Sequence, residues 1–150
     1  MNIDAIVIPC SKNKKTTPAE AEYLYVGPYY KACLDYAKKH TKKKNIYILS
    51  AKYGFIKLND IIAPYNTKIT KKIKQERRCF YINTAKQHNL TDKRILVLDG
   101  RLYVDVVRTV TRKILTAPFY GQPLGIQLRE MKNVNSQANK ILCRPPTKGP

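Results

Sequence analysis

Tryptophan is absent from the 150 residues, and histidine and glycine are scarce. Only two histidines, His40 and His88, accompany the four cysteines at positions 10, 33, 79 and 143. No pair among them has the close spacing of a zinc site, so no metal is expected, and no cofactor is indicated. The glycines of a P-loop are missing as well, which argues against a nucleoside triphosphatase.

Long apolar runs and a signal-peptide pattern are also missing. We therefore expect a cytoplasmic protein with reduced thiols and no membrane partner. The length suits a single domain that needs no disulfide bonds, and we place it at residues 1–143. Residues 144–150 have the composition of a disordered basic tail. The sequence leaves the oligomeric state open.

Acidic residues are few, with 10 Asp and Glu against 29 Lys and Arg, for a formal net charge of +19. Such an excess favours a polyanionic partner, because neutralising phosphates releases counterions. Nucleic acid is the leading candidate, with DNA favoured over RNA, and the eleven tyrosines offer rings for base stacking. An AT-rich genome, whose codons favour lysine, is the alternative explanation. The basic runs at 38–44 and 68–78 could equally be solvated helix faces.

Three continuously apolar segments, at residues 3–9, 46–50 and 94–99, predict buried strands, and a fourth is expected at 115–119. Helices are predicted at 28–40, 70–88, 103–111 and 125–140, a loop or short helical turn at 18–25 and an ordered loop at 57–67. Continuous hydrophobicity is typical of parallel strands covered on both faces. The predicted fold is therefore α/β, a three-layer α/β/α sandwich around a mostly parallel four-stranded sheet.

In such a sheet, ligands bind beyond the carboxyl ends of the strands. That edge gathers a set of candidate side chains from the first three strands: Cys10, Ser11, Lys12, Lys14, Ser50, Lys52, Tyr53, Asp99 and Arg101. Asp99 is the predicted catalytic residue, because a strand-end carboxylate can orient water or stabilise a cationic transition state. It could also cap the helix that follows.

The other candidates have two interpretations each. Ser11 and its loop could hold a phosphate with Lys12 or Lys14. No histidine lies near Cys10 in the sequence to form a nucleophilic pair with it, so we expect an inert thiol. Lys52 and Tyr53 could contact substrate, or be a surface lysine and a packed ring. Asn66, also predicted as catalytic, could bond a base edge or its own turn.

Six motifs together resemble a family of small bacterial, archaeal and phage proteins. They lie at residues 8–12, 24–30, 49–56, 64–66, 98–103 and 123–128, so the resemblance covers about residues 3–130. That family is similar to the YaaA peroxide-stress proteins and to a domain of archaeosine-forming enzymes. The wider group implies a fold like that of uracil-DNA glycosylases. The water-activating Gly-Gln-Asp-Pro-Tyr loop and the late catalytic histidine of those glycosylases have no counterpart here.

The resemblance implies one pocket lined by the Cys10–Lys12 loop, the 50–54 turn, residues 64–66 and Asp99. We expect an enzyme that cleaves or exchanges a base at the N-glycosidic bond in nucleic acid, with the base stacked on Tyr53 or Tyr65. The alternative is a non-catalytic nucleic-acid-binding protein that retains this fold. A third possibility is an enzyme that acts on free nucleotides or nucleosides.

Overall fold

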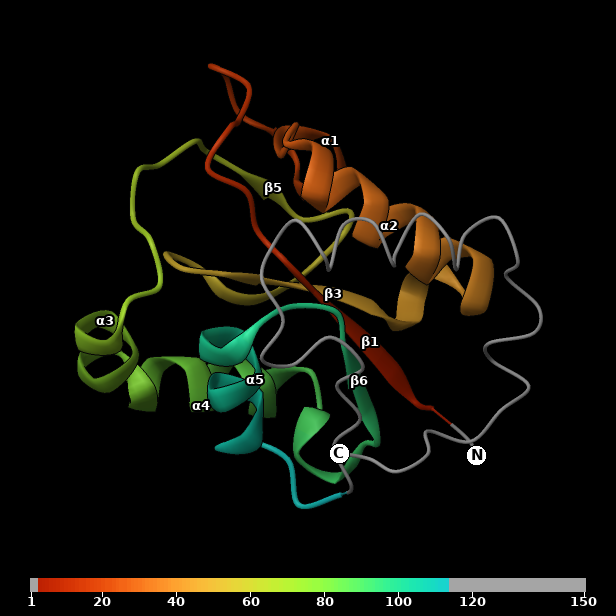
Figure 1. Ribbon diagram of the computed structural model, residues 1–150, viewed down its shortest axis with the longest axis vertical. Helices are drawn as coiled ribbons and strands as arrows, with labels where there is room; N and C mark the ends of the chain where they lie inside the picture. The colour runs from red at the N-terminus through yellow and green to blue at the C-terminus, as the bar shows by residue number, and fades with distance from the viewer. Residues whose placement is uncertain (1–2, 114–150) are drawn as a thin grey trace.

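The computed structural model describes residues 3–113, which form a mixed α/β fold around one four-stranded sheet (Figure 1). The strands lie in the order β4-β3-β1-β6, with β1 at Ala5–Pro9, β3 at Ile46–Ser50, β4 at Gly54–Lys57 and β6 at Ile95–Val97. The predicted strand at 115–119, the predicted helix at 125–140, the boundary at residue 143 and the tail lie outside the described residues.

Strand β1 lies between β3 and β6 and runs parallel to both. Ile6 is paired with Ile46 on one side and with Leu96 on the other. Every residue of the three strands is buried. Burial on both faces explains why these segments are apolar without alternation. The three strands predicted at 3–9, 46–50 and 94–99 are confirmed.

Strand β4 was not predicted, and it runs antiparallel to β3. A three-residue turn at 51–53 returns the chain, so that Ser50 is paired with Gly54. Gly54 has a φ of 79°, a conformation that favours glycine. A Cβ at this position would also lie 2.4 Å from Thr84 Oγ1. The segment after β3 is therefore a tight hairpin, and the sheet is mostly rather than wholly parallel.

The helices are α1 at Ala21–Leu24, α2 at Pro28–His40, α3 at Lys71–Glu76, α4 at Arg78–Gln87 and α5 at Arg101–Arg108. The prediction of a helix at 28–40 is confirmed. The single helix predicted at 70–88 is wrong, because it is interrupted at Arg77 (φ −108°, ψ 13°). The Thr70 hydroxyl caps α3 by accepting from the Ile73 amide at 3.1 Å. Helix α5 starts two residues before the predicted 103.

Two short strands form a second, antiparallel ribbon beside α1. They are β2 at Ala19–Glu20 and β5 at Ile61–Ile62, and β5 lies inside the segment that was predicted as loop. Two 3-10 turns, η1 at Lys43–Asn45 and η2 at Leu90–Asp92, precede β3 and β6. The ribbon connects the β1 loop to the segment that carries Tyr65.

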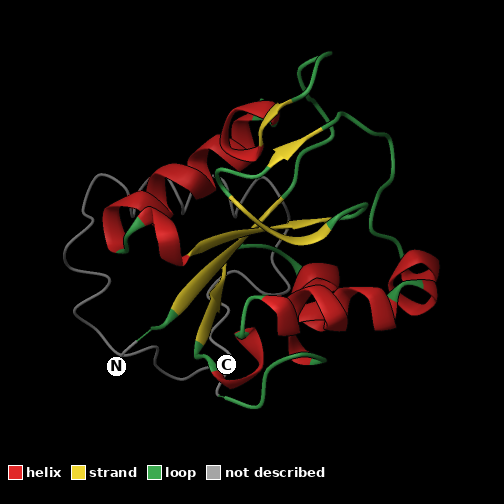
Figure 2. Cartoon of the chain, turned by 180° about the vertical axis from the view of Figure 1, so that it is seen from behind, coloured by secondary structure: helices red, strands yellow, loops and turns green. Residues whose placement is uncertain are grey.

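The helices cover both faces of the main sheet. Crossover connections between parallel strands are right-handed, and the chain moves from β1 to β3 in one direction and from β3 across β1 to β6 in the other. The two crossovers therefore place α2 on one face and α4 on the opposite face, as Figures 1 and 2 show. Helix α2 packs against β1, and α5 packs against β6 and α3.

Candidate functional site

The carboxyl edge of the sheet contains a topological switch point between β1 and β6. The loop after β1 leads to α2 on one face, whereas the loop after β6 leads to α5 on the other. Open α/β sheets bind ligands in the crevice that forms where neighbouring loops diverge in this way. Here the switch point lies between the strand ends that carry Cys10 and Asp99, and a hydrogen bond of 3.1 Å between Cys10 Sγ and Tyr103 Oη links the two loops.

Asp99 is a buried carboxyl group at this switch point, with only 9% of the residue exposed. Its Oδ1 accepts a hydrogen bond of 2.6 Å from the Gly100 amide, and Gly100 is itself the N-cap of α5. Burial raises the pKa of Asp99 to about 7, while hydrogen bonds from the Gly100 amide and the Tyr29 hydroxyl oppose this rise. Near neutral pH the group therefore occurs both as an acid that can donate a proton and as a carboxylate.

Three further side chains surround Asp99, and sequence reasoning assigned none of them to the site. Cys33 of α2 donates to the Leu98 carbonyl at 3.4 Å, and the Tyr29 hydroxyl, one turn earlier on the same helix, lies 3.5 Å from that carbonyl as well as near Asp99. Burial and the nearby Asp99 carboxylate raise the pKa of the Cys33 thiol. Tyr103 comes from α5, and burial and the nearby Cys10 raise the pKa of its phenol. Tyr29 and Tyr103 belong to the motifs at residues 24–30 and 98–103. Membership of these motifs was the one sequence signal that could have assigned them to the site.

A second cluster is centred on the Tyr65 hydroxyl. Ser50 Oγ donates to it at 2.7 Å, and the Tyr25 hydroxyl shares a hydrogen bond of 2.7 Å with it. Ser50 Oγ also accepts from the Tyr53 amide at 3.0 Å, which holds the turn. Tyr65 is 9% exposed and its pKa is raised by burial. Tyr65 is therefore a buried residue that packs behind the site. The ring of Tyr53 is half-buried and lies edge-on to the Tyr65 ring, with 5.5 Å between the ring centres.

The lysines of the predicted site are not equivalent. Lys12 and Lys52 are exposed, whereas Lys14 is half-buried with its Nζ 4.3 Å from the centre of the Tyr65 ring. Burial lowers the pKa of Lys14, and the nearby Cys10 thiol opposes that shift. Lys14 therefore lies between the Asp99 cluster and the Tyr65 cluster.

The remaining predicted residues lie around these clusters. The Ser11 hydroxyl accepts from the Gly27 amide at 3.1 Å and donates to the Asn13 carbonyl at 2.6 Å, so it fastens the β1 loop to the start of α2. Asn66 and Arg101 are exposed, and Arg101 is the first residue of α5. The structure thus brings Cys10, Lys14, Ser50, Tyr53, Tyr65 and Asp99 into two adjoining clusters and leaves Asn66, Arg101, Lys12 and Lys52 at the surface.

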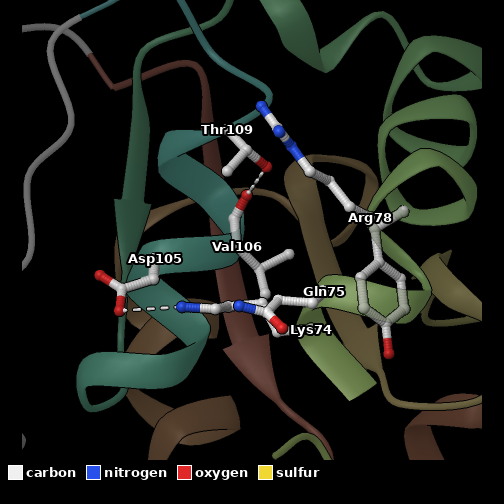
Figure 3. A pocket seen from close by; sticks show the side chains of 7 residues that line it. Lys74, Gln75, Arg78, Asp105, Val106 and Thr109 are labelled. Carbon is white, nitrogen blue, oxygen red and sulfur yellow. Dashed lines mark hydrogen bonds and ion pairs between the residues drawn. The ribbon is translucent and has the colours of Figure 1, made fainter. Parts of the chain in front are cut away.

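A pocket of about 220 Å³ lies between α3, α4 and α5 and contains none of the predicted site residues. Figure 3 shows Lys74 reaching across it to Asp105, and their charged atoms are 3.5 Å apart. Its wall meets the site at one point, where the Tyr81 hydroxyl donates to the Ala51 carbonyl at 2.7 Å. Because Asp99, a buried carboxyl group with a raised pKa, lies at the carboxyl edge, we place the candidate site there rather than in this pocket.

Neither a metal cluster nor a membrane span emerges from the described part of the chain. Within residues 3–113, no three His, Cys, Asp or Glu side chains are grouped so that they could hold a metal ion. Over the same residues, no helix combines the length and the apolar character needed to cross a membrane.

Comparisons with known proteins place the chain in a family. A stretch of 63 residues is 38% identical to "Uncharacterized protein YfjM" of Bacillus subtilis (strain 168), covering 38% of this chain and 41% of that protein. This chain thus spans about two fifths of the relative's length. No solved structure matches the chain. The model of a family of unknown function, DUF6884, matches residues 5–133. The chain therefore belongs to the DUF6884 family.

Proposed function

We propose that this protein acts on a nucleobase in nucleic acid, DNA in preference to RNA, and cleaves or exchanges the base at the N-glycosidic bond. The observation that carries the proposal is Asp99, a buried carboxyl group with a pKa near 7 at the switch point of the sheet. A carboxyl group poised in this way can protonate a leaving base or, once ionised, stabilise the oxocarbenium ion that remains.

The surroundings of Asp99 suit a polyanionic substrate. Within residues 3–113, the ammonium groups of Lys12, Lys14 and Lys52 form no ion pair with a carboxylate. They are therefore available to phosphate oxygens on the strand that carries the base. Helices α3 and α4 add further exposed cations, Lys71, Lys72 and Arg78. The formal net charge of +19 supports the same partner.

Base recognition is assigned to the rim of the site. The Tyr53 ring is half-exposed and is fixed by its hydroxyl, which donates to the Ala63 carbonyl at 3.3 Å. A held ring of this kind can stack on an extruded base. Tyr65 backs that ring instead of stacking itself, and the exposed Asn66 amide offers a donor and an acceptor to a base edge. The likeness to uracil-DNA glycosylases and YaaA proteins is part of this proposal, supported by the mixed α/β fold alone.

A base-release assay on modified and unmodified DNA tests the proposal, with Asp99→Asn as the critical variant. We expect this substitution to lower base release by about 100-fold or more, because the amide can neither donate a proton nor carry charge. Asp92→Asn is the matched control, since Asp92 is exposed in η2. Equal activity of the Asp99→Asn variant and the wild type would remove Asp99 from the mechanism.

The unpaired lysines equally favour a second function, a nucleic-acid-binding protein without turnover. That protein would bind duplex or single strands with a steep salt dependence and release no base. A filter-binding series in salt, run beside the base-release assay, separates the two functions. Negligible affinity at low salt would contradict both.

A further inference from the structure

Lys14 has surroundings that set it apart from the other lysines at the carboxyl edge. Its Nζ lies over the Tyr65 ring at 4.3 Å and near the Tyr25 ring at 5.8 Å. Within residues 3–113, its Nζ donates a hydrogen bond of 3.3 Å to the Lys12 carbonyl. Among residues 3–113 it has no carboxylate partner, whereas the similarly half-buried Lys74 is paired with Asp105.

These contacts hold the amine in place while withdrawing it from water. The aromatic rings limit the positions that the flexible side chain can take. Loss of solvent lowers the pKa of Lys14, so a larger fraction of this amine is uncharged than of an exposed lysine. Only an uncharged lysine amine is a nucleophile, and desolvation is one of the ways in which proteins activate it.

The position of the amine determines which electrophile it can meet. Lys14 lies beside Cys10, which in turn is bonded to Tyr103 next to Asp99. If Asp99 acts on an N-glycosidic bond, the sugar of that nucleotide binds at the same strand-end edge that carries Lys14. A sugar that has lost its base opens to an aldehyde at C1′, and aldehydes are the partners with which lysine amines form Schiff bases.

We propose that Lys14 is the nucleophile of an abasic-site lyase activity, acting on the C1′ aldehyde of a base-free nucleotide in a DNA strand. The lone pair of Nζ adds to C1′, and loss of one water gives an iminium linkage between the lysine and the sugar. Solvent water then removes a proton from C2′. The electron pair left behind forms a double bond as the C3′–O3′ bond breaks and the 3′ phosphate departs. Hydrolysis of the linkage restores the amine.

The inference rests on the proposed function for the position of the sugar, but its test does not require base release. The probe is an oligonucleotide that already contains one abasic site, incubated with the full-length protein and sodium borohydride. Borohydride reduces the iminium linkage to a stable amine, so the protein becomes joined to the strand. Proteolysis and mass spectrometry then identify the residue that carries the adduct, which we expect to be Lys14.

Two variants sharpen this test. Lys14→Arg keeps a cation over the Tyr65 ring but cannot form the linkage, and we expect trapping and strand cleavage to fall by about tenfold or more. Lys15→Arg is the matched control, because Lys15 is the exposed neighbour in the same loop and should trap as the wild type does. Thermal unfolding of both variants reports whether they are folded. If Lys14→Arg is not folded, the adduct mapped on the wild-type protein tests the proposal instead.

Several results would overturn the proposal. Among them are an adduct on the N-terminal amine, an adduct spread over many exposed lysines, and undiminished trapping by folded Lys14→Arg. Failure of the proposed function gives a different pattern. In that case Asp99→Asn and the wild type both release no base, while trapping at Lys14 persists in both.

Discussion

Two carboxyl groups are buried in the described residues, and their surroundings drive their pKa values in opposite directions. Glu22 in α1 is 6% exposed and pairs with both Lys38 and Lys43. Hydrogen bonds and charge from these two lysines outweigh the effect of burial, so the pKa of Glu22 is lowered. Asp99 is 9% exposed, and within residues 3–113 its carboxyl group has hydroxyl and amide neighbours but no ion pair, so burial raises its pKa to about 7.

The difference supports the assignment of Asp99, rather than Glu22, to the proposed function. A buried carboxylate with two cationic partners is satisfied and holds elements together, here α1, the end of α2 and η1. A buried carboxyl group without such a partner costs stability at neutral pH, a cost that proteins accept mainly at functional sites. The comparison also explains the lysine run at 38–44. Two of its members neutralise Glu22, whereas the lysines at the carboxyl edge remain available.

The largest expected effect concerns the pH dependence of stability and Asp99→Asn. In the unfolded chain Asp99 ionises near pH 4, but in the folded protein it ionises near pH 7. The folded state therefore binds an extra proton between these values, and the stability from this group falls as pH rises through them. We expect Asp99→Asn to match the wild type near pH 4 and to exceed its free energy of unfolding by about 4 kcal/mol at pH 8. Urea unfolding at both pH values measures this difference. The same difference in unfolding free energy at pH 4 and pH 8 would contradict the raised pKa of Asp99.

A smaller effect is expected from removing two lysine charges at the carboxyl edge or, for comparison, two from the run at 38–44. Lys12→Gln with Lys52→Gln should weaken DNA binding by about tenfold and lower the salt slope by about two. Lys42→Gln with Lys44→Gln removes the same charge from the run at 38–44 and should leave affinity within about twofold. Filter binding at several salt concentrations measures both pairs. Equal losses would mean that net charge rather than the carboxyl edge governs binding.

Glu22→Gln should have an effect of opposite sign to Asp99→Asn. We expect a loss of about 1 kcal/mol at pH 7, kept small because the lysine partners are partly exposed. The pKa of Glu22 is lowered, so its stabilisation is present above the unfolded pKa and is lost as pH falls below about 4. Unfolding of Glu22→Gln and wild type should therefore converge in acid. Glu20→Gln, at an exposed position, serves as the control.

The smallest expected effect is that of Tyr29→Phe. The Tyr29 hydroxyl is one of two hydrogen-bond donors that lower the pKa of Asp99 against the effect of burial. Its removal should shift the midpoint of the Asp99-dependent stability change to higher pH. A set of unfolding curves between pH 5 and pH 9, compared with those of Asp99→Asn, locates that midpoint. An unchanged midpoint would show that the Tyr29 hydroxyl does not affect the pKa of Asp99.

The main elements could be predicted because they depend on local patterns. Strands β1, β3 and β6 are buried on both faces, so their hydrophobicity is unbroken, and Pro28 marks the start of α2. The position of Asp99 at the carboxyl edge followed from the same patterns. Its neighbour Tyr29 was missed because the contact depends on how α2 packs on the sheet.

The remainder depended on partners that lie far away in the sequence. Tyr65 is buried because Tyr25 and Ser50 reach its hydroxyl, across 40 and 15 residues of chain. Strand β4 requires Thr84 of α4, whose Oγ1 accepts from the Phe55 amide at 3.1 Å. At the break between α3 and α4, the Arg77 guanidinium contacts the 50–54 turn through the Lys52 carbonyl. None of these contacts has a signature within a short window of sequence.

Arg77 also has a thermodynamic consequence. Its Nη2 donates to the Lys52 carbonyl at 2.6 Å, and its guanidinium lies 4.3 Å from the centre of the Phe80 ring. The junction of two basic helices is thereby tied to the turn that presents Tyr53. A partner that reorients α3 must strain or break this tie, and occupancy of the turn must in return alter the affinity of α3 for that partner by the same factor. Under the proposed function, the helix break thus links the binding of the nucleic-acid backbone to the recognition of the base.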